Sequence, residues 1–271
     1  MIYVIPCGLG KMGKAVASSV LKNEGMDIFG AIEAPNYSFI DRDVIGLIGG
    51  DTSSHGEIYA ETKWNDSWFS RYPIVAVSFA NPSATMEHAE MCFEHDIALV
   101  AGTTGLGDKR LAKLKEYAEK IPFVYDSNFS KGINIMDKVS FELAKLLPDW
   151  DAEIVEKHHS QKVDAPSGTA IRLAKTIAKA RGQKPEDVIV NTRYDGDNRP
   201  RKRGEIGLQA LRAGDIIGEH EITFAGAGQR IELNHRAHSR DNFASGVIEA
   251  INWIVGKPAG FYNAQDVFGL R

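Results

Sequence analysis

The sequence predicts an α/β protein with two domains, the first built on a parallel β-sheet and the second an α+β domain with a mixed sheet. Three observations support this fold class. In the first half of the chain, short apolar runs rich in β-formers alternate with helical patterns, as in successive βαβ units. Between residues 188 and 236, strand patterns follow one another with few helices between them. At 271 residues the chain is also long for a single hydrophobic core.

The first element is a short strand over Ile2–Ile5, which leads into the turn Gly8-Leu-Gly10-Lys-Met-Gly13. A helical pattern follows, and a second apolar run over 28–32 ends at Glu33, 20 residues after the third glycine. Strand, G-x-G-x-x-G, helix, strand and acid at this spacing form the dinucleotide fingerprint of a Rossmann-like domain. The glycines let the backbone approach a pyrophosphate at the helix N-terminus, and the acid can accept hydrogen bonds from the adenosine ribose. The candidate cofactor contacts are therefore Gly8, Leu9, Gly10, Lys11, Met12, Gly13 and Glu33.

Three later strands, over 74–79, 97–100 and 123–125, each end in a polar turn, and helices over 84–95 and 109–120 follow the first two. Ligands of an open parallel sheet sit at the carboxyl ends of its strands, so these turns should line the cofactor cleft. The candidate contacts from the second and third turns are Gly102, Thr103, Thr104, Ser127, Asn128 and Phe129.

Composition and charge argue against several classes of protein. A net charge of −4 gives no reason to expect nucleic acid, and no apolar run approaches the ~20 residues that span a bilayer. The start, MIYVIPCGLG, lacks the basic region and long apolar stretch of a signal peptide. Cys7 and Cys92 are expected to be buried reduced thiols, which fits a cytoplasmic protein. Residues 36–70 show little periodicity, so we expect loops and a short strand there without assigned chemistry, and His55 as a solvated residue.

The second domain begins with a helix over 132–147 and a strand over 152–155, and a helix capped by Ser167 follows over 170–180. Three further strands are expected to be antiparallel and joined by turns at 213–215 and 226–229; they cover 206–211, 216–225 and 230–236. The basic run Arg199, Arg201, Lys202 and Arg203 is expected to be a solvated or subunit-contacting loop.

A last helix over 242–255 has a wide apolar face and is expected to return to the first domain. The dinucleotide-binding domain is thus expected at 1–129 and 241–271, with residues 130–240 inserted as the substrate domain.

The segment Glu153–Ala170, EIVEKHHSQKVDAPSGTA, carries the densest chemistry of the chain. His158, His159 and Lys162 can be cationic, and Ser167-Gly-Thr169 opens a helix whose dipole attracts anions. Histidine exchanges protons near pH 7, and lysine adds a point charge. The segment therefore predicts a carboxylate site with proton donors beside it. Together with a reduced nicotinamide, it indicates reduction of an activated, electron-poor double bond.

Two other readings of the histidines remain. A metal site would draw its ligands from His158, His159, His220, His235 and His238. The chain lacks an H-x-x-x-H helix or a cysteine cluster, and Lys162 would repel a cation, so no metal is expected. Alternatively, a single histidine could be packed and hydrogen-bonded, which would leave Lys162 and the Ser-Gly-Thr turn unexplained.

The segment 153–170 resembles the 4-hydroxy-tetrahydrodipicolinate reductase (dihydrodipicolinate reductase) family of lysine biosynthesis. Supporting matches cover nearly the whole chain; they are Gly8–Gly13, Gly102-Thr-Thr-Gly105, Ser127-Asn-Phe-Ser130, Gly132-Ile-Asn-Ile-Met136 and Gly218-Glu-His-Glu-Ile-Thr-Phe224. The resemblance implies NAD(P)H-dependent reduction of 4-hydroxy-tetrahydrodipicolinate to tetrahydrodipicolinate in the diaminopimelate route. It also implies a homotetramer built through the sheets of the substrate domains.

Carried over by residue, the resemblance makes His158 a proton donor and acceptor and Lys162 a proton donor. It makes His159, Gly168 and Thr169 contacts of the substrate carboxylates. The implied cofactor contacts are Gly8–Gly13, Glu33, Gly102–Thr104 and Ser127–Phe129.

Two departures from the family pattern concern the cofactor. Lys11 and Ala34 stand where the family often has arginine. A carboxylate at Glu33 without a neighbouring arginine repels a 2′-phosphate, so NADH is favoured, while Lys11 leaves NADPH open.

Two rival functions fit the sequence less well. A nucleotide-sensing regulator of the same fold would not need the proton donors His158 and Lys162. An amino-acid or aspartate dehydrogenase would bind an amine, which clustered cations disfavour.

Overall fold

The computed structural model describes residues 1–28, 30–48, 57–60, 64, 73–191 and 200–271. The expectations for His55 and Arg199, and those for much of 36–70, lie outside these residues. The chain forms two compact units, Met1–Lys131 with Arg240–Arg271 and Gly132–Ser239. The assignment of nucleotide binding to one domain and of substrate binding and tetramer assembly to the other stays a prediction.

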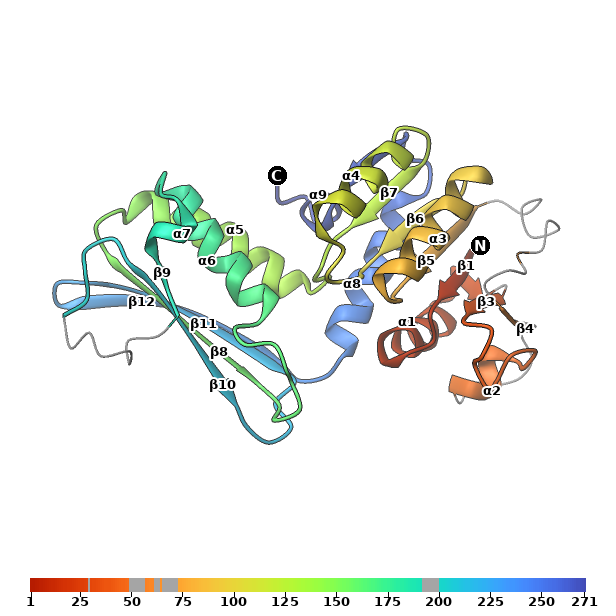
Figure 1. The fold of residues 1–271 in the computed structure, drawn as a ribbon, viewed down its shortest axis with the longest axis horizontal. Helices are drawn as coiled ribbons and strands as arrows, with labels where there is room; N and C mark the ends of the chain where they lie inside the picture. Colours follow the sequence, from red (N-terminus) through yellow and green to blue (C-terminus); the bar gives the residue numbers. More distant parts are fainter. Residues whose placement is uncertain (29, 49–56, 61–63, 65–72, 192–199) are drawn as a thin grey trace. The chain divides into compact units, whose positions relative to one another are not determined.

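The first unit is built on an eight-stranded parallel sheet, as predicted (Figure 1). Its order is β13-β7-β6-β5-β1-β3-β4, with β2 beside β1. The strands are β1 (Ile2–Cys7), β2 (Met26–Ile28), β3 (Gly30–Glu33), β4 (Glu57–Ala60), β5 (Ile74–Ser78), β6 (Ala98–Ala101), β7 (Pro122–Tyr125) and β13 (Gly260–Tyr262). The helices are α1 (Lys11–Leu21), α2 (Val44–Ile48), α3 (Pro82–Glu94), α4 (Gly107–Tyr117), α8 (Asp241–Ile254) and α9 (Ala264–Val267).

Both faces of this sheet are covered, which explains why its strands are continuous apolar runs. On one face Val4, Val75 and Val124 pack in a core with α1 and α8. On the other face Ile5 and Phe123 pack in a core with α3 and α4. Helix α8, predicted over 242–255, therefore returns to the first sheet, as its wide apolar face predicts.

The ends of the elements follow local chemistry. Helix α3 begins at Pro82, two residues before its predicted start, because Asn81 accepts hydrogen bonds from the N–H groups of Ser83 and Ala84. Cys7 and Cys92 are both buried, as predicted. Among the described residues, no helix combines the length and hydropathy needed to cross a membrane.

The second unit is built on a five-stranded mixed sheet with the order β12-β11-β8-β10-β9. The strands are β8 (Asp151–His158), β9 (Ile189–Val190), β10 (Ile206–Arg212), β11 (Gly218–Gly226) and β12 (Gln229–Ala237). The three later strands run in alternating directions, as expected, and β11 and β12 pair as an antiparallel hairpin. The expectation that β10 is joined directly to β11 in the sheet is wrong, because β10 pairs in parallel with β8. Strand β8 lies between β10 and β11, so the turn at 213–215 does not close a hairpin.

Helices α5 (Lys131–Leu146), α6 (Gly168–Ala180) and α7 (Pro185–Val188) lie on one side of this sheet (Figure 1). The core between them contains Ile154, Leu173 and Phe224, all fully buried. The buried side chains of β8 are those of Ala152, Ile154 and Glu156, at every second position. A carboxylate therefore takes a place where the alternation would put a third apolar side chain.

Candidate active site

The glycine-rich turn after β1 has the backbone geometry that its fingerprint requires. Gly8 has a φ of +93°, which side-chain-bearing residues rarely adopt. A Cβ at Gly13 would lie 1.8 Å from the Gly8 carbonyl oxygen, so only glycine lets α1 pack this close to the turn. A Cβ at Gly10 would meet no described atom within 4 Å. The start of α1 is thus open to a group that approaches the backbone, and a pyrophosphate fits it.

Glu33, at the end of β3, reaches back to this turn. Its Oε2 accepts a hydrogen bond of 2.5 Å from the Leu9 N–H, and its Oε1 accepts one of 2.9 Å from the Ala34 N–H. The two predicted parts of the fingerprint, 24 residues apart, are therefore brought together. Lys11 is exposed and Met12 half-buried in the same turn.

The turns after β5, β6 and β7 meet at the carboxyl edge of the sheet. The Gly102 N–H donates to the Ser78 carbonyl at 3.0 Å, and the Tyr125 hydroxyl donates to the Thr103 carbonyl at 3.0 Å. The rings of Phe79 and Phe129 lie 6.1 Å apart. A Cβ at Gly102 would come within 2.1 Å of the Phe79 ring, so this glycine allows two turns to touch.

The side chains of these turns divide into two groups. Thr103 is 3% exposed, and its Oγ1 lies 2.6 Å from the Thr85 hydroxyl. Asn128 is also buried, and its Oδ1 accepts a hydrogen bond of 2.9 Å from the Ser130 N–H. These two side chains hold the turns in shape, whereas Thr104 and Ser127 are exposed at the same edge.

In the second unit, a polar cluster lies at the end of β8. Glu156 is fully buried, and its Oε2 lies 2.5 Å from Nδ1 of His158. Arg212 donates to both Glu156 oxygens, at 2.9 Å and 2.8 Å. The Ser167 N–H donates to Oε1 at 2.9 Å. The ring centroid of His220 lies 5.4 Å from that of His158.

Ser167 is the N-cap of α6, as predicted: its Oγ accepts a hydrogen bond of 3.2 Å from the Ala170 N–H. The same Oγ lies 3.3 Å from Nε2 of His220. Gly168 is exposed, and a Cβ there would meet no described atom within 4 Å. Thr169 is half-buried beside it. The first turn of α6 thus has open space over its backbone.

His159 and Lys162 lie in the turn that follows β8. The Lys162 N–H donates to the His159 carbonyl at 3.1 Å, and both side chains are half-buried. The Lys162 ammonium pairs with the Asp164 carboxylate at 2.7 Å. The six predicted residues of this cluster, from His158 to Thr169, therefore lie at the end of β8, in the turn that follows it and at the start of α6.

The pKa values in the cluster follow from burial and partners. Burial opposes ionisation of Glu156, but hydrogen bonds from Arg212, His158 and the Ser167 N–H together lower its pKa. Burial lowers the pKa of His158, although Glu156 acts in the opposite direction. Burial, aided by repulsion from His158, lowers the pKa of His220 to about 3, so this imidazole is neutral at physiological pH.

Sequence reasoning did not assign a role to Glu156 or Arg212. Glu156 lies two residues before His158 in a strand, and this spacing puts both side chains on one face. That signal could have found it. Arg212 has no local signal, because only the pairing of β8 with β10 sets it beside His158.

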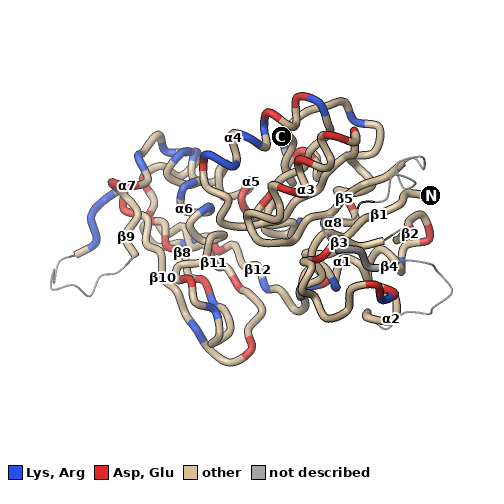
Figure 2. Tube along the Cα trace, turned by 45° about the vertical axis from the view of Figure 1, so that its right-hand side comes forward, with Lys and Arg blue, Asp and Glu red and all other residues tan. Residues whose placement is uncertain are grey.

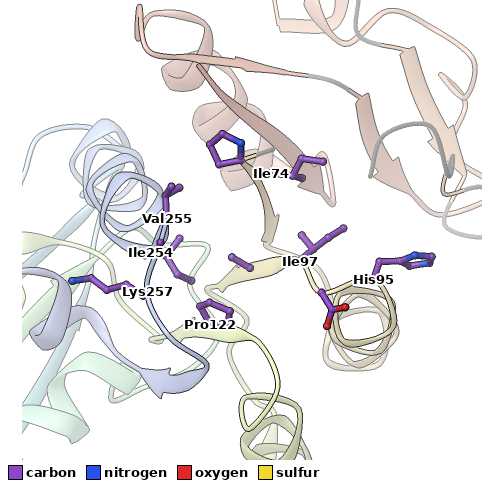
Figure 3. Close-up of a pocket in the computed structure, with 11 residues that line it drawn as sticks. Ile74, His95, Ile97, Pro122, Ile254, Val255 and Lys257 are labelled. Atoms are coloured by element: carbon purple, nitrogen blue, oxygen red, sulfur yellow. The ribbon is translucent and has the colours of Figure 1, made fainter. Parts of the chain in front are cut away.

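Possible metal ligands and cavities also bear on the site. No group of three or more metal-ligating side chains occurs among the described residues. A cavity of about 210 Å³ lies in the first unit, lined by residues that include Ile74, Ile97, Pro122 and Lys257 (Figure 3). It lies where β5, β6 and β7 begin, at the edge opposite the polar turns, so it is not the nucleotide site.

Charges of both signs are mixed within each unit, so local groups decide which anion binds (Figure 2).

Comparison with known proteins matches both halves of the chain. The family model described as "Dihydrodipicolinate reductase, N-terminus" matches residues 2–129, and "Dihydrodipicolinate reductase, C-terminus" matches residues 132–268. The 4-hydroxy-tetrahydrodipicolinate reductase of Syntrophus aciditrophicus is 38% identical over 99% of this chain and 98% of its own. That of Geotalea daltonii is 37% identical over 100% of both chains.

Solved structures agree. A dipicolinate-bound dihydrodipicolinate reductase from Paenisporosarcina sp. TG-14 is 27% identical, with a TM-score of 0.75 over 98% of both chains. An amine dehydrogenase from Mycobacterium smegmatis, 14% identical with a TM-score of 0.63 over 97% of this chain and 95% of its own, shares the fold alone. The fingerprint turn, the histidine cluster and the match over both halves lead to one conclusion. The chain belongs to the dihydrodipicolinate reductase family.

Proposed function

We propose that this chain reduces 4-hydroxy-tetrahydrodipicolinate to tetrahydrodipicolinate with a reduced nicotinamide, in the diaminopimelate route to lysine. One observation carries this conclusion: relatives named for this activity match the chain from end to end at 37–38% identity. The polar cluster at the end of β8 supports it, because the chemistry needs a carboxylate receptor and a proton source.

The bound nicotinamide supplies hydride, and the protein residues bind and orient it. The backbone from Gly8 to Gly13 is the proposed pyrophosphate site, since α1 begins there with open space over Gly10. The Glu33 carboxylate is the proposed acceptor for the ribose hydroxyls, because it already accepts from the Leu9 N–H of this turn. The turns at Gly102–Thr104 and Ser127–Phe129 are the proposed contacts nearer the nicotinamide.

The substrate is a small dicarboxylate, and dipicolinate, bound by the solved relative, has the same two carboxylates. His159, Lys162 and the backbone of Ser167–Thr169 are the proposed carboxylate contacts. One cation about 4 Å from a carboxylate is worth ~4 kcal/mol at an effective dielectric of 20, before desolvation. Lys162 pairs with the exposed carboxylate of Asp164, and an incoming substrate carboxylate would compete with Asp164 for the Lys162 ammonium.

The substrate first loses its 4-hydroxyl and a proton from the neighbouring ring carbon as water, which leaves a C=C bond conjugated with the imine. Hydride from the nicotinamide then adds to this double bond and leaves an enamine-like anion that must be protonated. His158 is the proposed proton donor and acceptor, with Lys162 as a second donor. Burial lowers the pKa of His158, which makes its protonated form a stronger acid than a solvated imidazolium. Such a donor releases its proton readily once the anion forms.

NADH is the proposed preferred cofactor. Glu33 would repel a 2′-phosphate, and Ala34 offers no cation against it. Lys11 is exposed in the same turn and offsets part of this repulsion, so NADPH is expected to work less well. The active form is proposed to be a homotetramer assembled through the sheets of the second units.

A coupled assay tests the proposal. The protein is incubated with 4-hydroxy-tetrahydrodipicolinate synthase, pyruvate and aspartate semialdehyde, and absorbance at 340 nm is followed with NADH and then with NADPH. We expect oxidation that depends on the synthase, with the higher kcat/KM for NADH. If absorbance stays constant with both nucleotides while the synthase product accumulates, the proposed reaction is wrong.

A further inference from the structure

We propose that the buried Glu156 carboxylate and the half-buried Arg212 guanidinium form a positioning pair that fixes the tautomer of His158, so that Nε2 is the nitrogen that exchanges the catalytic proton. The catalytic part of this inference rests on the proposed function. The tautomer itself is a property of the folded protein and can be measured without substrate.

Four donors converge on the Glu156 carboxylate. Arg212 supplies two guanidinium N–H groups, one to each oxygen, in a bidentate arrangement. The Ser167 N–H adds a third donor at Oε1, and Nδ1 of His158 lies 2.5 Å from Oε2. The carboxylate is fully buried, yet these donors lower its pKa, so it is ionised at neutral pH.

An ionised carboxylate only accepts hydrogen bonds, so the short contact fixes which imidazole nitrogen carries hydrogen. Nδ1 of His158 must be the donor to Glu156. In the neutral ring the lone pair is then on Nε2, and in the protonated ring Nε2 carries the mobile proton.

Gly218, on β11, keeps space open at this nitrogen. A Cβ there would lie 3.1 Å from Nε2 of His158, closer than ordinary van der Waals contact. A side chain at 218 would therefore crowd Nε2, which the glycine avoids, while the other ring nitrogen is held by Glu156.

The same pair connects the other parts of the site. Arg212 also donates to the Asp164 carbonyl at 2.6 Å, in the turn that carries Lys162. Through Glu156 it is connected to the Ser167 N–H at the start of α6. This ion pair thus links the ends of β8 and β10, the lysine turn and the helix start. A lysine at 212 would not reproduce this, because it lacks the planar fork of donors.

Charged and titratable groups face His158 from every neighbouring element. Glu156 lies on its own strand, Arg212 on β10, His220 on β11 and Lys162 in the following turn. Arg212 and Lys162 disfavour a protonated His158, whereas Glu156 favours it. Removing the Glu156 charge should therefore lower the pKa of His158 and shift the pH profile of activity to lower pH.

The first test measures the tautomer in the wild-type protein and uses a variant only to assign the resonances. Protein labelled with ¹⁵N-histidine is studied by solid-state NMR at pH 8, with resonances of His158 assigned by their loss in His158→Gln. We expect the neutral Nδ1–H tautomer. The Nε2–H tautomer would overturn the inference, whatever the enzyme's activity.

The second test compares Glu156→Gln with a matched control, Glu153→Gln. Glu153 lies on the same strand, on the opposite face, and also pairs with an arginine, Arg201, at 3.0 Å. For Glu156→Gln we expect kcat to fall roughly 100-fold, near the lower end of what positioned proton transfer supplies. The KM for NADH should stay within about twofold, the pH profile should shift to lower pH, and the His158 tautomer should be lost or mixed. The control should stay within about threefold of wild type in kcat.

A folded Glu156→Gln protein with wild-type kcat and pH profile would contradict the positioning role, as would an equal loss in the control. If Glu156→Gln does not fold, the wild-type tautomer still decides the inference. Failure of the proposed function is seen separately, as absence of turnover in the wild-type coupled assay.

Discussion

Acid should destabilise this protein well above the pH at which its carboxylates titrate, because two histidines are buried in neutral form. His88 is 1% exposed and His220 is 5% exposed. Burial lowers their pKa values from 6.5 to about 4 and about 3, with repulsion from His158 adding to the shift of His220. Each contacts a serine hydroxyl, Ser78 for His88 and Ser167 for His220.

The sign follows from proton binding. The folded-state pKa values are lowered, so below pH 6.5 the unfolded chain binds protons that the folded chain excludes. The stability that the two neutral histidines contribute is fully present above about pH 6.5, and it is lost as the pH falls toward their folded-state pKa values. At pH 5 each of the two histidines lowers the free energy of unfolding by about 2 kcal/mol, or by about 4 kcal/mol together. The pKa values of His158 and His235 are also lowered by burial, so they act in the same direction.

Urea unfolding at pH 7.5 and pH 5.0, at one protein concentration, measures this loss. His88→Asn and His220→Gln place an amide near the nitrogen that each ring uses, and each should remove about half of the pH dependence. His88 and His220 lie in different units, so two separate transitions would each lose about 2 kcal/mol. An unfolding free energy that is the same at both pH values would refute the reasoning.

Two further predictions concern the ligands. Glu33→Ala should weaken NADH binding roughly 10- to 100-fold, the range for one or two lost hydrogen bonds to a charged group. It should weaken NADPH binding far less, because the substitution also removes the repulsion of the 2′-phosphate. Titration by nucleotide fluorescence measures both affinities, and equal losses would show that Glu33 does not contact the ribose. Pyridine-2,6-dicarboxylate should compete with substrate in the coupled assay, raising its KM without changing kcat, and an absence of inhibition at millimolar concentration would count against a dicarboxylate site.

Most of the first unit could be predicted because its central strands β1, β5, β6 and β7 are buried on both faces and the long helices have one apolar face. The predicted strands before Phe79, Val100 and Tyr125 are β5, β6 and β7, within one or two residues. The short elements β13 and α9 were missed, since three or four residues carry no periodicity. The parallel pairing of β10 was missed because β8, distant in sequence, takes the place that a hairpin partner would have.

The residues of the site also divide into those that the sequence could reveal and those that it could not. His158, Lys162 and the Ser-Gly-Thr turn could be found because they are close together in the sequence. Arg212 and His220 reach His158 and Glu156 only through the registers of β10 and β11 against β8. Strand register is a property of the assembled sheet, so a single sequence does not reveal which distant residues complete the cluster.

The central claim is that the cluster at the end of β8 delivers the proton that completes a nicotinamide-dependent reduction. Turnover of His158→Gln with substrate made by the synthase, measured beside its affinity for NADH, tests this most directly. We expect kcat to fall by about two orders of magnitude or more while nucleotide affinity stays unchanged. A variant that turns over at the wild-type rate would contradict the claim.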